Sequence, residues 1–179
     1  MIKTLPLPLE IYPSQILREK ARELKQKELQ NQEIKQLILN MAKTMRENAG
    51  VGLAAPQIGV SKRIALIEIL SDNPRYPNQR EVSLVVLINP KITRRSFHKE
   101  LGEEGCLSIP EVFGLVKRSL KIKVKALDQE GKKIKFKATG FFARVIQHEV
   151  DHLNGVLFID KTKEITKGKE ILESMTNNF

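Results

Sequence analysis

The sequence predicts an α+β fold in which antiparallel strands surround a central buried helix. Two observations lead to this prediction. Over residues 116–138, apolar residues alternate with lysines on both sides of a turn at 128–131, which is typical of an antiparallel hairpin with one buried face. Residues 141–155 then change to a helical pattern that is apolar around most of its circumference. This pattern indicates a buried helix that ends near Gly155.

The elements before the hairpin are separated by glycines and by one polar loop. A helix is expected over residues 31–48, because apolar residues recur there at helical spacing, and Gly50 follows as a natural stop. The next elements are expected to be a loop at 50–59, a buried strand at 63–70, a polar and proline-broken surface loop at 71–83, and a buried strand at 84–89. Residues 103–110 read as one further short strand.

Composition places the chain among globular proteins of one domain. Its 179 residues are 41% hydrophobic and 29% charged, a size and balance sufficient for a hydrophobic core. The single cysteine, Cys106, excludes an internal disulfide. The N-terminus lacks the apolar stretch of a signal peptide, and no apolar run approaches the roughly 20 residues of a membrane span, so a cytoplasmic protein is expected. The formal charge of +10 indicates either an anionic partner or a solvated basic surface.

The strongest chemical signal is the pair of histidines in the segment His148-Glu149-Val150-Asp151-His152. Residues four apart on a helix lie about 40° apart around its axis, so both imidazoles project from one face and can bind one metal ion. Glu149, beside the first histidine, can then exchange a proton with a water molecule. Burying these polar groups on an apolar helix is costly without compensation, which favours a metal site over a solvated helix face.

The identity of a third ligand decides the class of enzyme, because catalytic sites of this kind use three protein ligands. A third histidine after the motif is excluded, since Phe158 holds that position. A downstream glutamate, Glu170 or Glu173, would give a zinc endopeptidase. A lone cysteine such as Cys106 is usually a small buried apolar residue, but its thiolate is a strong ligand for Zn²⁺ or Fe²⁺. The residues alone favour Cys106 and leave the glutamates as an alternative.

Three motifs resemble those of the peptide deformylases, in the same order and with similar spacing. They are GVGLAAPQ at residues 50–57, EGCLS at 104–108 and QHEVDHL at 147–153. The resemblance extends over about residues 5–160 and includes the phrases INP, VKR and NGVLFID. It implies a peptide deformylase-like catalytic domain over residues 1–160. A basic C-terminal tail follows at 161–179, with a short helix expected at 169–175.

The resemblance also implies an activity and a cofactor. The activity is a metal-dependent hydrolysis that removes the formyl group from the N-terminal methionine of newly synthesised polypeptides and releases formate. The metal would be Fe²⁺, replaceable by Zn²⁺, Ni²⁺ or Co²⁺, and its ligands would be Cys106, His148 and His152. The ligand types suit both Zn²⁺ and Fe²⁺, so the iron assignment comes from the family alone.

Roles for the other motif residues follow from the same resemblance. Glu149 would act as general base and then as general acid. The Gln57 side-chain amide and the Leu107 backbone N–H would stabilise the oxyanion. The residues expected to line the substrate path are Gly50, Val51, Gly52, Glu104 and Gly105. Gly52 would let the substrate backbone approach closely and pair as an added strand, and Glu104 is expected to be a structural or entrance residue.

The expected partners are N-formylmethionyl nascent peptides and, through the basic tail and the lysine face of the hairpin, the ribosome; no DNA or membrane partner is expected. A rival hypothesis is a non-catalytic RNA- or ribosome-binding protein with a relic metal site. Intact Glu149 and Gln57 speak against it, because a relic site need not keep them. Asp151 is expected to support the site through Arg118, and His98 to lie in a surface loop.

Overall fold

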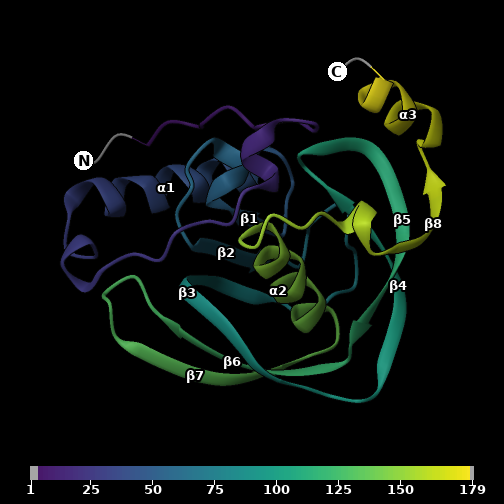
Figure 1. Ribbon diagram of the computed structural model, residues 1–179. Coiled ribbons are helices and arrows are strands. Elements are labelled where there is room, and N and C mark those ends of the chain that lie inside the picture. The colour runs from purple at the N-terminus through teal and green to yellow at the C-terminus, as the bar shows by residue number, and fades with distance from the viewer. Residues whose placement is uncertain (1–3, 178–179) are drawn as a thin grey trace.

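The computed structural model describes residues 4–177 and confirms the predicted α+β class. Its elements in chain order are η1 Gln15–Arg18, η2 Gln26–Glu28, α1 Gln32–Glu47, β1 Gly52–Ala54, η3 Ala55–Ile58, β2 Ile64–Ile69, β3 Val82–Arg95, β4 Lys99–Cys106, β5 Ile109–Ser119, β6 Lys121–Leu127, β7 Lys133–Thr139, α2 Gly140–His152, η4 Phe158–Asp160, β8 Thr162–Lys167 and α3 Lys169–Asn177. The strands form two antiparallel sheets, with the orders β1-β2-β3-β6-β7 and β4-β5-β8. Helix α2 lies at the centre of the molecule, between the two sheets (Figure 1).

Helix α1 forms where the spacing of apolar residues predicts it. The Asn31 side chain caps its start by accepting a hydrogen bond from the Glu33 backbone N–H at 3.0 Å. The end differs from the expectation in one detail. The left-handed conformation is taken by Ala49, with a φ of 50°, rather than by Gly50. The Gly50 N–H donates to the Met45 carbonyl at 2.9 Å, which closes the last turn and directs the chain toward β1.

Strand β2 is buried on both faces and forms the centre of the hydrophobic core. Ile64 and Leu66 pack in the cluster that includes apolar residues of α1, whereas Ile67 and Ile69 pack in the cluster that includes residues of α2. Each buried side chain of this size contributes about 1.5–3 kcal/mol relative to exposure. The continuous apolar run at residues 63–70 therefore reflects a strand covered on both sides, and α2 is held firmly against the larger sheet.

The β6–β7 hairpin confirms the alternating pattern of the sequence. Val124 pairs with Phe136 and Lys123 with Lys137, so successive residues face opposite sides of the sheet. Ile122 and Val124 are buried in the cluster beneath α2, and the lysines of the hairpin face outward.

The predicted single strand within residues 116–127 is wrong. The chain leaves the smaller sheet at Ser119 and enters the larger sheet at Lys121, with Leu120 as the crossing point. The Leu120 N–H donates to the His98 carbonyl at 3.1 Å, which holds the crossing against the turn between β3 and β4. Three polar residues, Lys117, Arg118 and Ser119, interrupt the apolar alternation just before the crossing, a break that the prediction of a single strand passes over.

Two other strands differ from the sequence prediction. The strand predicted at 84–89 continues to Arg95 as β3, past Pro90, where the pairing register shifts; a bulge is a position at which a strand tolerates proline. The segment 103–110 is not one strand but the tight reversal between β4 and β5, where Cys106 pairs with Ile109.

The C-terminal residues join the fold as strand and helix. Strand β8, which the sequence does not predict, adds to the edge of β5, and Leu115 pairs with Glu164. The predicted short helix is α3, whose Leu172 and Met175 pack against the cluster that contains Val112. Helix α3 lies at the upper right of Figure 1, at one end of the molecule. None of the described helices combines the length and apolarity required to cross a membrane.

Candidate metal centre and active site

Three side chains from two elements converge at one point. Cys106 is the last residue of β4, and His148 and His152 project from one face of α2. His152 Nε2 lies 3.2 Å from Cys106 Sγ and 3.2 Å from His148 Nε2. The candidate ligand atoms of all three residues lie within 4.8 Å of one another. The structure therefore brings together the three ligands that the sequence predicts.

This donor set fits a divalent metal ion. Nitrogen ligands at about 2.0–2.1 Å from a tetrahedral ion lie about 3.3 Å apart, close to the separation of the two imidazole nitrogens here. One thiolate and two imidazoles suit Zn²⁺ and Fe²⁺. Burial lowers the pKa of His152, so this ring remains in the neutral form that binds metal. Three ligands leave a fourth position free for water or substrate.

Glu104 fixes the orientation of the His148 ring. Its Oε2 atom lies 3.0 Å from His148 Nδ1, a contact that a proton on Nδ1 satisfies and that directs Nε2 toward Cys106 and His152. Burial lowers the pKa of His148, but its contacts with Cys106 and Glu104 outweigh this effect and raise the pKa well above its ordinary value. These two contacts thus favour positive charge at this point, and a bound cation would supply it.

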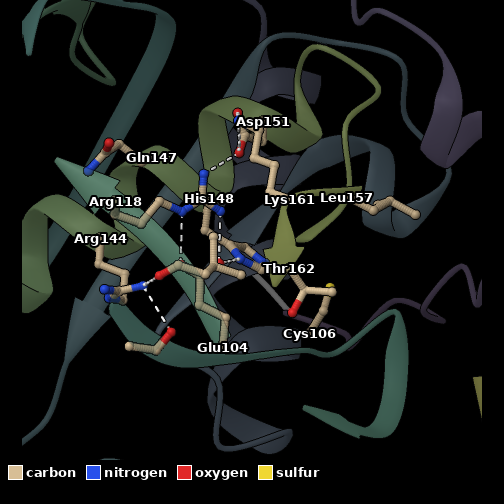
Figure 2. A network of polar contacts seen from close by, with 12 residues as sticks. Glu104, Cys106, Arg118, Arg144, Gln147, His148, Asp151, Leu157, Lys161 and Thr162 are labelled. Atoms are coloured by element: carbon tan, nitrogen blue, oxygen red, sulfur yellow. Dashed lines mark hydrogen bonds and ion pairs between the residues drawn. The ribbon is translucent and has the colours of Figure 1, made fainter. Parts of the chain in front are cut away.

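The Glu104 carboxylate is itself held by two arginines from different elements (Figure 2). Arg118 of β5 donates from Nε and Nη2 to its two oxygens at 2.8 Å each, and Arg144 of α2 donates at 2.8 Å to Oε1. Burial acts to raise the pKa of Glu104, but Arg118 and His148 reverse this effect and hold it well below its usual range. Glu104 is only 5% exposed. The sequence analysis expects Glu104 to be a structural or entrance residue along the substrate path; in the structure it lines the cavity and both of its oxygens are engaged by Arg118, Arg144 and His148.

Asp151 extends this network to the C-terminal side of α2. Arg118 Nη1 donates to Asp151 Oδ2, as the sequence suggests, and Lys161 contacts both Asp151 oxygens at 2.6 Å. Figure 2 shows Arg118 between Glu104 and Asp151. Arg118 is thereby shared by two buried carboxylates, and Arg144 and Lys161 supply the further positive charge that they need, a condition under which buried charge is tolerated.

Glu149 lies beside the metal ligands in an apolar setting. It is 3% exposed, and its Oε2 atom has no hydrogen-bond partner among the described residues. Burial raises the pKa of Glu149 to about 7, in the range suited to proton transfer near neutral pH. Gly52 of β1 packs directly against this carboxylate, since a Cβ atom there would lie 2.3 Å from Glu149 Oε1. The glycine is therefore required by the position of Glu149.

Gln57 is oriented by a hydrogen bond on its far side. Its Oε1 atom accepts from the Ala54 backbone N–H at 2.9 Å, which directs the amide nitrogen toward the site. That nitrogen lies 3.4 Å from Cys106 Sγ and 3.2 Å from Ser108 Oγ. The amide nitrogen is thus held beside the candidate metal ligands as a donor, in contact with Cys106 Sγ and Ser108 Oγ.

One cavity brings together the residues predicted as metal ligands, catalytic residues and substrate-binding residues. All of these line a narrow cavity of about 60 Å³ except His152, which is buried. A second hollow of about 350 Å³ adjoins it and shares Gly105, Cys106, Leu107 and Phe113 with it. The cavity lies next to β1 and β4, each of which is the edge strand of its sheet.

Sequence reasoning missed part of the cavity wall. Phe141, Arg144 and Val145 stand on the same face of α2 as His148, at helical spacing, so the motif itself could have indicated them. Tyr76, in the predicted surface loop, is half-buried against Phe141, with ring centroids 4.9 Å apart. No periodic pattern indicates that this loop folds over the cavity.

The remaining residues singled out in the sequence lie away from the candidate metal ligands or use their side chains elsewhere. Glu170 and Glu173, the alternative metal ligands, are exposed on α3, and the only metal-binding group found among residues 4–177 is the one with Cys106. His98 is exposed in the turn before β4, as expected. Gln147, next to His148, uses its side chain to pair with the Ser119 backbone at 3.2 and 2.9 Å.

Comparison with known proteins agrees with the geometry. Residues 6–168 match the family model for polypeptide deformylase. A peptide deformylase from Desulforudis audaxviator is 47% identical over 89% of this chain and 95% of its own length. The crystal structure of a class I type b peptide deformylase from Acinetobacter baumannii with bound Met-Ala-Ser is similar, with a TM-score of 0.86, 42% identity and coverage of 89% of this chain and 99% of that one. A peptide deformylase from Thermotoga maritima aligns with a TM-score of 0.77 and 37% identity over 89% of this chain and 99% of that one. With Cys106, His148, His152 and Glu149 gathered beside one cavity and these relatives along nearly its whole length, the chain belongs to the polypeptide deformylase family.

Proposed function

We propose that Cys106, His148 and His152 hold the catalytic metal of this deformylase and that Glu149 transfers the protons of its reaction. The chain is a metal-dependent hydrolase that removes the formyl group from the N-terminus of newly synthesised polypeptides and releases formate. The observation that supports the proposed roles is the meeting of one thiol and two imidazoles beside a buried carboxylate.

We propose Fe²⁺ as the ion, with Zn²⁺, Ni²⁺ or Co²⁺ as substitutes. When bound, the cation supplies Lewis-acid chemistry: it polarises the formyl group and lowers the pKa of water so that a nucleophile exists at neutral pH. The protein orients the ligands for it through the Glu104 contact to His148 Nδ1 at 3.0 Å.

Glu149 would accept a proton from the attacking water at its unpartnered Oε2 atom and later deliver it to the departing amine. A pKa of about 7 lets one carboxyl group perform both transfers, since neither protonation state is far from the other in free energy at neutral pH. A nearby cation lowers this pKa and favours the base form at the start of the cycle.

Gln57 and Leu107 would stabilise the charge that develops on the formyl oxygen. The Gln57 amide is already aimed at the site by its bond to Ala54, so little reorganisation is needed when charge develops. Leu107 lines the cavity at the reversal that follows Cys106, where its backbone is close to the ligands.

The substrate would enter as an extra strand. Gly50, Val51 and Gly52 lead into the edge strand β1, and Gly105 belongs to the edge strand β4, so a peptide between them finds free backbone groups on the sheet edges. The methionine side chain would occupy the cavity beside these strands. We infer that Glu104 contributes to this path indirectly, by holding His148.

The test is formate release from a formyl-methionyl dipeptide by freshly prepared, Fe²⁺-loaded protein. Glu149→Ala should retain the metal and lose turnover; turnover like that of the parent protein would remove Glu149 from the mechanism. Cys106→Ala should lose the metal. Full metal retention in that variant would favour a different ligand set and with it the endopeptidase alternative.

We also propose that the enzyme works in the cytoplasm and contacts the ribosome through its basic surface, where formylated chains emerge. The outward lysines of β6 and β7 provide an exposed face of one charge. Co-sedimentation with ribosomes should weaken steeply as salt is raised, because phosphate contacts release counterions. The basic tail at residues 161–179 contains β8 and α3, which pack on the rest of the fold, so its removal would disturb the structure. Its contribution to ribosome binding is therefore tested with Lys163→Gln and Lys169→Gln. Salt-independent sedimentation would contradict this contact.

A further inference from the structure

The turn between β3 and β4 presents an aromatic side chain entirely to solvent. Phe97 is 102% exposed, whereas the other large exposed apolar residues of the described chain reach at most 53%. Nothing in the fold requires a phenylalanine there, because the ring packs against no core cluster. An aromatic ring in water is unfavourable for solubility, so its presence suggests a contact with a partner.

Cations surround this ring. We define the basic corner as Phe97 with six positively charged residues: Arg94, Arg95, Lys99, Lys117, Lys121 and Lys123. These residues line two adjoining surface hollows that share Arg95 and Ser96. No described carboxylate lines either hollow, and none of the six cations has an ion pair within the part of the chain that the structure describes.

The backbone holds the basic corner in one shape. It lies where the chain crosses between the two sheets: Ser96 N–H donates to the Lys121 carbonyl at 2.8 Å, and Leu120 N–H donates to the His98 carbonyl at 3.1 Å. The Ser96 hydroxyl also donates to the His98 carbonyl at 2.7 Å and so closes the turn. A partner that binds here therefore meets a backbone that is already ordered, so binding carries little ordering cost for the main chain.

The C-terminal tail carries less net positive charge than the basic corner. Residues 161–179 contain four lysines and three glutamates, a difference of one positive charge. Lys161 is paired with Asp151 and Lys167 with Glu111. The β3–β4 turn lies at the lower edge of Figure 1, away from α3 at the upper right, so the two surfaces are separate.

We propose that the basic corner binds single-stranded RNA, with Phe97 stacked on an unpaired base and the surrounding cations on phosphates. Aromatic rings beside a basic groove are the means by which proteins bind single strands without strict sequence preference. The choice of RNA rests on the proposed function, because the substrate emerges from a ribosome, whose RNA exposes unpaired loops. The proposal thus assigns the RNA contact of this enzyme to the crossing of its sheets.

The test is fluorescence anisotropy of the metal-loaded enzyme with a labelled twelve-nucleotide single-stranded RNA at several salt concentrations. Phe97→Ala should weaken binding roughly tenfold, as expected when one base no longer stacks on the protein. Lys121→Gln with Lys123→Gln should weaken binding and lower the slope of log affinity against log salt by about 0.7 for each phosphate that the variant no longer neutralises. The matched control, Lys27→Gln with Lys35→Gln, removes two exposed lysines elsewhere and should bind like the parent protein.

Three results would overturn the proposal. Phe97→Ala could bind RNA as well as the parent protein, the control pair could weaken binding as much as the corner pair, or vesicles with anionic lipid could compete with RNA at equal charge and show the same dependence on Phe97. Because binding is measured without substrate, the result stands whether or not the enzyme releases formate. Formate release by the Phe97 variant should equal that of the parent protein, and an unchanged thermal midpoint would show that the variant folds.

Discussion

Replacing Gly52 with alanine tests whether the position of Glu149 limits the reaction. The new Cβ would lie 2.3 Å from Glu149 Oε1 and 2.7 Å from its Cδ. Ordinary contact requires about 3.4 Å or more, so the carboxylate must move by about 1 Å. A misplacement of this size can cost about 10²-fold in rate, equivalent to about 2.7 kcal/mol of barrier. Because the carboxylate is the end of a flexible side chain, the fold should absorb the change.

The assay is steady-state formate release from a formyl-methionyl dipeptide, together with metal content and thermal midpoint. Gly52→Ala should lower kcat about 100-fold with metal content and thermal midpoint nearly unchanged. In a Glu149→Asp background, where the shorter side chain leaves room for the new methyl group, Gly52→Ala should lower kcat by less than it does in the parent protein. If kcat is unchanged and only KM rises, the glycine serves substrate approach and the reasoning from Glu149 is refuted.

Three further predictions concern the network under the metal. Arg118→Ala should lower the free energy of unfolding by about 3–5 kcal/mol, since it leaves Glu104 and Asp151 buried without their common partner, and urea unfolding measures this; a decrease below about 1 kcal/mol would contradict it. The folded state holds the pKa of Glu104 below its unfolded value, so the stability that ionised Glu104 contributes is complete above about pH 4.5 and declines as pH falls. The free energy of unfolding of Glu104→Gln should therefore decrease less than that of the parent protein between pH 5 and pH 3. Parallel decreases in the two proteins would contradict this role of Glu104. Removing the metal with a chelator should abolish formate release and lower the thermal midpoint, both restored by Fe²⁺ or Zn²⁺; an unchanged midpoint would mean that no ion binds this site in the folded protein.

The chemistry of the site could be predicted because its signals are local in the sequence. His148 and His152 share a helix face by spacing alone, and Cys106 is the only thiol in the chain. What spacing could not supply is the distance between β4 and α2, which depends on how the two sheets pack. The proximity of Cys106 to α2 therefore depends on tertiary packing. For this reason the sequence alone left Glu170 and Glu173 as alternatives to Cys106 for the third metal ligand.

Strand boundaries were harder to predict than the site. The crossing at Leu120 follows the polar residues Arg118 and Ser119, which are buried, so their polarity does not mark a surface loop and the change of sheet cannot be recognised from the pattern. Strand β8 contains more exposed than buried positions, so it lacks the apolar pattern that indicates a strand. It forms because β5 offers free backbone groups at its edge, and that opportunity appears only once β4 and β5 have paired.

Arg144 illustrates a second limit. Its position four residues before His148 was visible in the sequence, yet a charged residue on an apolar helix reads as a solvent contact. In the structure it donates to the Gly102 and Val116 carbonyls and to Glu104, joining α2 to the smaller sheet. Its role depends on partners from two strands that are distant in sequence.

The ion pairs around Glu104 bear on how the candidate metal site forms. Since Arg118 and Arg144 fix this carboxylate from β5 and α2, and the carboxylate in turn contacts His148 Nδ1, the fold itself sets the orientation of the imidazole. With His148 as a metal ligand, as proposed, little side-chain rearrangement would accompany the binding of an ion. One thiol and two imidazoles suit several transition metals, so such a site would accept one divalent ion in place of another without remodelling of the chain.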